Sequence, residues 1–95
     1  MSIGILTLTI SLPNSHSLKE KRRQIKPILA RLHREFNISV AESDHQDVWQ
    51  TCEILIVCAA SRGNHIEKTL EQVITFFEKH WPDLPLLDEK IEIII

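Results

Sequence analysis

The spacing of the apolar residues constrains the fold of this chain more than any other feature of its sequence. In residues 3–12 apolar and polar side chains alternate, which predicts a strand with one buried side. Two later stretches carry apolar residues every three or four positions, as amphipathic helices do. In the first stretch these are Leu18, Ile25, Leu29, Leu32 and Phe36, and in the second they are Ile66, Leu70, Val73, Phe77 and Trp81.

Polar residues mark the ends of both predicted helices. Ser17 and Glu20 have the spacing of a capping box, in which each side chain accepts a backbone N–H of the first turn, and Asn37 is a typical stop residue. Asn64 and Glu67 repeat the capping spacing ahead of the second helix. Pro82 ends that helix, because the residue before a proline is disfavoured in helical conformation.

Three further strands are predicted at residues 38–42, 48–60 and 90–95, so the order of elements is βαββαβ. With right-handed crossovers this order gives an α+β ferredoxin-like plait. It has a four-stranded antiparallel sheet with residues 3–12 and 48–60 at its centre and both helices on one face. A chain of 95 residues is long enough for one such core, so residues 1–95 are expected to form a single domain.

The second face of this sheet has no helix to cover it. Thr7, Thr9, Ser39, Ala41 and Thr51 tolerate solvent there, but the apolar side chains of the same face do not. A second subunit would cover them, and a homodimer is therefore one expectation. These apolar residues are Ile3, Ile5, Leu55 and Val57.

Positive charge is concentrated in the first helix. Residues 1–40 carry seven Lys or Arg and two Asp or Glu, a net charge of +5, whereas residues 41–95 carry four and eleven, a net charge of −7. All seven early positive residues fall between Lys19 and Arg34. The asymmetry thus belongs to one element.

Within that helix the charges lie on one side. At about 100° per residue, most of them fall in a sector from about 40° to about 160° measured from Leu18, together with His33, whereas Lys21 lies outside it. Such a stripe suits the phosphates of a nucleic acid, although charges also solvate ordinary helices. Both interpretations stay open at this point. We call the stripe the basic flank: Lys19, Arg22, Arg23, Lys26 and Arg34.

A polar loop at residues 43–47 is a second candidate site. Asp44, His45 and Asp47 offer carboxylate and imidazole groups, which are metal ligands, yet Asp side chains in short hairpin loops commonly bond the local backbone. We favour a structural turn, with a metal site and a partner contact as alternatives. Trp49 follows directly, and with the three loop residues it makes a candidate partner interface.

No familiar enzyme motif is present, because the chain has no Gly-rich phosphate loop, GxSxG, HExxH or Cys/His pair of catalytic type. We predict a non-catalytic protein without cofactor, bound metal or small-molecule substrate. Base stacking on the open sheet face is not expected, since that mode requires aromatic residues on the central strands and only Trp49, at one end, is available.

The cysteines and the apolar runs indicate where the chain resides. Cys52 and Cys58 are six residues apart in one predicted strand, too far for a disulfide, and so are expected to be buried thiols in a reducing compartment. The longest apolar run, residues 54–60, is too short to span a membrane, and no signal-peptide pattern opens the chain. These features predict a cytoplasmic protein that has no membrane partner.

Three motifs in order, SLKEKRR at 17–23, FNISVAE at 36–42 and DHQDVWQ at 44–50, make the chain resemble the bacterial YlxP-like family of domains of unknown function. The resemblance implies a ferredoxin-like plait. It also implies genes that often lie near those for a translation initiation factor and a ribosome-maturation factor, and no established activity.

Three functional hypotheses follow, of which the last is an enzyme or metal protein that uses Asp44, His45 and Asp47. The first is a non-catalytic factor that docks structured RNA, as rRNA or a ribosomal subunit, through the basic flank. The second is a protein-interaction or homodimerisation module that uses the open sheet face and the hairpin around Trp49.

Overall fold

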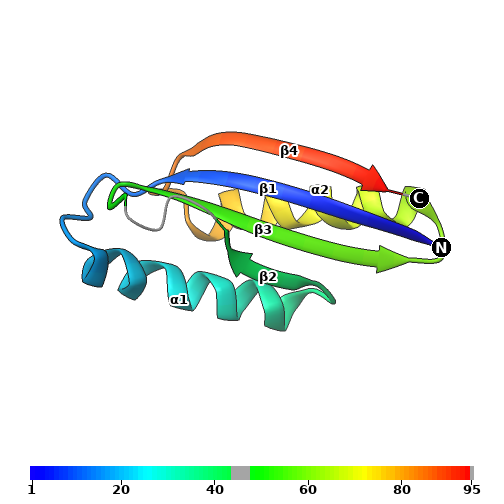
Figure 1. The fold of residues 1–95 in the computed structure, drawn as a ribbon, viewed down its shortest axis with the longest axis horizontal. Coiled ribbons are helices and arrows are strands. Elements are labelled where there is room, and N and C mark those ends of the chain that lie inside the picture. The colour runs from blue at the N-terminus through cyan, green and yellow to red at the C-terminus, as the bar shows by residue number, and fades with distance from the viewer. Residues whose placement is uncertain (44–47, 95) are drawn as a thin grey trace.

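The six predicted elements are present in a computed structural model that describes residues 1–43 and 48–94 (Figure 1). Strands form one layer and helices the other. In chain order the elements are β1 (Ser2–Ser11), α1 (Leu18–Glu35), β2 (Ser39–Glu42), β3 (Thr51–Ala60), α2 (Gly63–His80) and β4 (Leu86–Ile94).

The sheet has the order β2-β3-β1-β4, and every neighbouring pair is antiparallel. Ile5 of β1 lies opposite Val57 of β3, and Ile3 lies opposite Ile94 of β4. An irregularity between Thr9 and Ile10 shifts the register with β4. The predicted ferredoxin-like plait, with β1 and β3 at the centre, is therefore confirmed.

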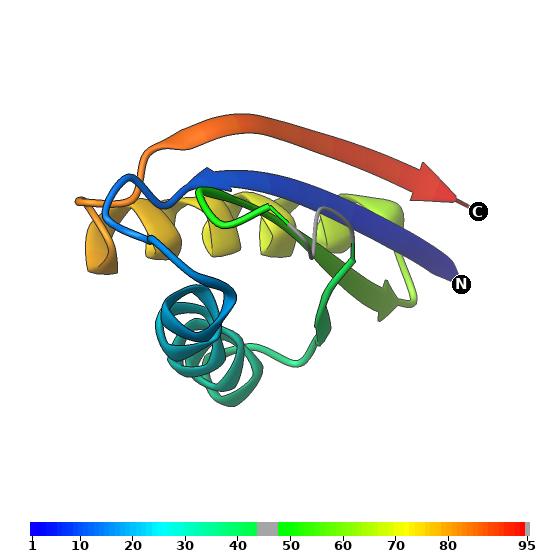
Figure 2. The ribbon, with the colours of Figure 1, turned by 60° about the vertical axis from the view of Figure 1, so that its left-hand side comes forward.

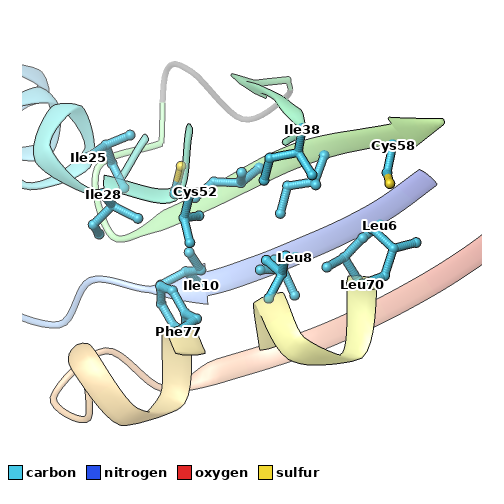
Figure 3. Close-up of a cluster of buried hydrophobic side chains, with 14 of the residues drawn as sticks. Leu6, Leu8, Ile10, Ile25, Ile28, Ile38, Cys52, Cys58, Leu70 and Phe77 are labelled. Atoms are coloured by element: carbon cyan, nitrogen blue, oxygen red, sulfur yellow. The ribbon is translucent and has the colours of Figure 1, made fainter. Parts of the chain in front are cut away.

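The core lies between the sheet and the two helices (Figure 3). Because side chains alternate along β1, its inward residues are fully buried, whereas the outward residues of the same strand stay partly exposed. Both helices contribute apolar side chains to this single cluster, as the periodicity predicted. Its fully buried members include Leu6, Leu8 and Ile10 from β1, Leu32 from α1, Ile54 and Ile56 from β3, and Ile66, Leu70, Val73 and Phe77 from α2.

The two helices approach the sheet differently. α2 packs along β1, β3 and β4, and it approaches β1 closely at Gly4, where a Cβ atom would overlap Cγ2 of Ile66. α1 instead lies against the edge strand β2, and Figure 2, which looks nearly along α1, shows it set apart from α2. Ile25 and Ile28 connect α1 to the core near Cys52 (Figure 3).

Some predicted boundaries were wrong. α2 begins at Gly63 with Arg62 as its N-cap residue, and no side chain caps it, so the predicted capping pair Asn64 and Glu67 lies inside the helix. β4 begins at Leu86 rather than at residue 90, and β3 begins at Thr51 rather than at residue 48.

The two cysteines are free and buried, as predicted. Among the described residues, neither helix is apolar enough over its length to cross a membrane.

Candidate functional site

The start of α1 is fixed by side-chain caps on both sides of Ser17. The Ser17 hydroxyl accepts a hydrogen bond from the Glu20 N–H at 3.1 Å. The Glu20 carboxylate accepts one from the N–H of His16 at 2.8 Å, one residue earlier than an ideal capping box would place it. These bonds set where the first turn begins and so where the basic flank begins.

The basic flank is exposed along its whole length, and all five members carry solvent-accessible side chains. The opposite side of α1 is buried through Lys21, Ile25, Ile28 and Leu32. His33 shares the sector of the flank, but its Nδ1 lies 3.0 Å from the carbonyl oxygen of Ile38, which ties that ring to the connection between α1 and β2.

The ion pairs that α1 forms with the described residues do not include the basic flank. Arg31 pairs with Glu35 one turn later at 3.3 Å, and Lys21 pairs with Glu42 of β2 at 3.0 Å. Within residues 1–43 and 48–94, no member of the basic flank forms an ion pair. The five cations that sequence periodicity grouped together are thus those that α1 does not neutralise.

Lys21 is a buried residue whose surroundings the sequence did not predict. It is only 1% exposed, and its ammonium group donates a hydrogen bond to the Val48 carbonyl oxygen at 2.8 Å in addition to its ion pair with Glu42. A buried lysine requires such partners, because removing its charge from water costs several kcal/mol, roughly. Lys21 therefore ties α1 to the end of β2 and to the segment that precedes β3.

The Cys52 thiol completes this buried polar cluster. Burial, and then the neighbouring Glu42 carboxylate, raise the pKa of Cys52 to about 12, against the opposing effect of Lys21. The thiol also hydrogen-bonds to Glu42, which favours its protonated form. Burial likewise raises the pKa of Cys58. Because nucleophilic attack requires the thiolate, neither cysteine suits covalent catalysis at neutral pH.

The hairpin loop is only partly described. Asp44, His45 and Asp47 lie outside the described residues, so the predicted turn, metal site and partner contact at these positions stay predictions. Trp49 is 50% exposed next to exposed Val48. In the part of the chain that the structure describes, no cluster of three or more His, Cys, Asp or Glu could hold a metal ion.

A ring cluster between the helices is a further feature that the sequence did not predict. Phe76 of α2 meets Phe36, at the end of α1, edge-to-face with centroids 5.4 Å apart, and it stacks on His80 at 4.0 Å. The Arg31 guanidinium lies 5.4 Å from the centre of the Phe76 ring. The spacing of Phe76 and His80 one helical turn apart was the available signal, but only the fold brings Phe36 to them.

Comparison with known proteins identifies the family. A family model described as "Protein of unknown function (DUF503)" matches residues 3–91, nearly the entire chain. The chain belongs to the DUF503 family. The uncharacterized protein YlxP of Bacillus subtilis (strain 168) is similar to it, at 36% identity over 76 residues that cover 80% of this chain and 83% of that protein. The predicted YlxP-like resemblance is confirmed.

A solved structure supports the architecture of this DUF503 domain. The de novo designed protein Foldit4 matches it with a TM-score of 0.54 at 15% identity, covering 100% of this chain and 98% of the designed one. At that identity the likeness concerns the fold alone. Since the DUF503 description assigns no activity, a function for the domain has to be argued from its own surface.

Proposed function

We propose that this domain is a non-catalytic factor that docks on structured RNA, such as a segment of ribosomal RNA, through the basic flank. The observation that carries the proposal is that the flank's five cations are exposed and without ion pairs among the described residues, while the other two cations of α1 are paired. Unpaired cations are available to replace the counterions of a phosphate backbone.

The spacing of the flank favours a helical, phosphate-lined surface. Arg22 and Lys26 lie one turn apart on α1, and Lys19 lies one turn from Arg23. The rise of about 1.5 Å per residue separates side chains one turn apart by roughly 6 Å along the axis. This distance is similar to that between neighbouring phosphates of one RNA strand, so that several contacts can form at once.

The test is binding of a fluorescent RNA hairpin, followed by anisotropy at low salt, with co-sedimentation with ribosomal subunits as a second readout. Replacing Arg22→Glu and Lys26→Glu together should weaken binding at least tenfold. The matched control is Arg62→Glu with Lys90→Glu, which makes the same change in net charge at exposed positions outside α1. Equal affinities of the two double variants, both folded by circular dichroism, would contradict the proposal.

A second candidate function is self-association through the open sheet face. Ile3 is 38% exposed and its cross-strand neighbour Ile94 is 49% exposed, and half-buried Ile5 and Val57 lie beside them. Such a contiguous apolar patch is typical of an interface. Light scattering over the micromolar range should detect a dimer that Ile3→Glu disperses and Leu87→Glu, an exposed apolar position outside the patch, does not. A monomer at every concentration would rule this candidate out.

A further inference from the structure

The surface between α1 and α2 carries a second feature that phosphate docking by the basic flank does not use. Two hollows adjoin there, of about 610 and 340 Å³. The larger is lined by Phe36, Phe76 and residues of the outer side of α2, and the smaller by residues from the middle of α1 and from the segment after α2. His80 lines both, so it lies at their junction.

The His80 ring is held in place on this surface. Its Nδ1 lies 3.0 Å from the Phe76 carbonyl oxygen one turn earlier, and its ring stacks on the Phe76 ring with an interplanar angle of 25°. When Nδ1 donates that hydrogen bond, Nε2 is the second polar atom of the ring. The side chain is nevertheless exposed, so part of the ring remains accessible to a ligand.

The Phe76 ring beneath His80 is itself fixed on two further sides. Phe36 packs against it edge-to-face, and the Arg31 guanidinium lies over it. A stacked pair that cannot easily rotate presents a flat, rigid aromatic surface. Every nucleobase has a π-face that can stack on such a surface, whatever its sequence.

Charge on the walls favours a polyanion. Arg23, Lys68 and Lys79 line the two hollows, against the carboxylates Glu71 and Asp83. Arg23 also belongs to the basic flank, so the smaller hollow is continuous with the surface assigned above to phosphate contact. A strand that lies along the flank therefore reaches His80 through the smaller hollow, which Arg23 and Asp83 both line.

We infer that the groove between α1 and α2 receives an unpaired base of the docked RNA, which stacks on the His80–Phe76 pair while its phosphate lies near Arg23. This inference rests on the proposed function and names the part of the RNA that the domain contacts: a loop or single-stranded extension next to a helix. The stacking surface is provided by the helices, not by the open sheet face.

The experiment compares RNA hairpins with and without a single-stranded extension, and a third whose extension is abasic. In a Trp49→Phe background Trp81 is the sole tryptophan, and its ring centre lies 6.2 Å from that of His80. The base-bearing extension should tighten binding about tenfold and change Trp81 fluorescence, and the abasic extension should do neither. His80→Ala should abolish both effects, and His80→Phe, which keeps an aromatic ring, should retain them.

His65→Ala is the matched control, because it removes an exposed histidine from the other end of α2. If the differences in affinity among the three RNAs are the same for His80→Ala and His65→Ala, the inference is wrong, although the proposed RNA docking by the basic flank is not contradicted. The extension could instead tighten binding and alter Trp81 fluorescence while Arg22→Glu with Lys26→Glu leaves the RNA affinity unchanged. That result would contradict phosphate contact by the basic flank and support the base site. Preference for an apolar peptide over every RNA would overturn both.

Discussion

Lys21 Nζ lies 3.0 Å from Glu42 Oε2, and this pair joins the first turn of α1 to the last residue of β2. With the Val48 carbonyl on the far side of the loop, the lysine holds helix and hairpin in one arrangement. Trp49 follows Val48, so the exposed tryptophan and the basic flank have a common internal support.

Removing the charge of Lys21 should destabilise the fold. Lys21→Met leaves the partly buried Glu42 carboxylate and the Val48 carbonyl without their lysine, and loss of one partner of a buried pair costs about 3 kcal/mol or more in the free energy of unfolding. Lys19→Met, two residues away and exposed, should change it by less than about 0.5 kcal/mol. Urea denaturation of both variants provides the measurement, and equal midpoints would show that the pair is not structural.

Combining Lys21→Met with Glu42→Leu should lower the free energy of unfolding by less than the sum of the two single replacements. In Lys21→Met with Glu42→Leu neither charge of the described pair is left buried, and apolar pairs that replace buried ion pairs are often tolerated. A double-mutant cycle on the same denaturation curves measures this coupling. Strict additivity would mean that the two side chains act independently.

Stability should fall on the alkaline side of pH 9.0 because of Cys52. Its thiol has a pKa of about 12 in the folded protein and an ordinary value of 9.0, so below pH 9.0 it is protonated in both states. Above pH 9.0 the unfolded chain loses the proton first, and the free energy of unfolding drops by up to about 1.4 kcal/mol per pH unit until pH approaches 12. Unfolding of Cys52→Ala across this range should show a shallower decline. An unchanged slope would assign the decline to other groups.

The close approach of β1 and α2 should make Gly4 intolerant of any side chain. In Gly4→Ala the new Cβ would overlap Cγ2 of Ile66 and lie 3.1 Å from Cδ1 of Leu70, both in the core. Such overpacking typically costs about 1–3 kcal/mol. At Gly63 the nearest atom to a Cβ is Ser2 Oγ at 3.7 Å, so Gly63→Ala is the control and should melt close to the unchanged protein. Equal melting temperatures of Gly4→Ala and Gly63→Ala would mean that α2 moves away from β1 without loss of stability.

The salt dependence of RNA binding should report how many phosphate contacts the basic flank makes. The logarithm of the binding constant should fall linearly with that of the salt concentration, and Arg22→Glu with Lys26→Glu should reduce the slope by about 2 or more, since two phosphate contacts are lost. Anisotropy titrations at several salt concentrations give the slope. A slope that stays the same would place the contacts on other residues.

The fold could be predicted where one face of a helix or strand is buried and the other is exposed. In β1, α1 and α2 the buried side chains recur with the period of the element, so the sequence pattern and the structure agree. β4 is an edge strand, and most of its residues on both faces are exposed. Its first residues therefore show no clear alternation of apolar and polar side chains, which explains why the strand was predicted to begin only at residue 90. The start of α2 was misplaced because Arg62 adopts the extended N-cap conformation without a side-chain cap.

The candidate site was predictable only to the extent that it is local. Helical spacing places Arg22 and Lys26 on one exposed side of α1 without knowledge of any other element. The burial of Lys21 depends on Glu42 in β2, and the stacking surface at His80 is completed by Phe36 from α1. These contacts join elements that are distant in sequence, and no spacing within one element encodes them.

The order of the strands separates the charges of the domain in space. α1 lies against β2 at one edge of the sheet, and β4, with three carboxylates to one lysine, forms the opposite edge (Figure 1). The molecule therefore has an electric dipole that runs across its strands. Near a polyanion this dipole experiences a torque before any contact forms, within a Debye length of about 8 Å at physiological ionic strength. In the proposed function, the fold thereby selects the orientation of approach as well as the surface that meets the RNA.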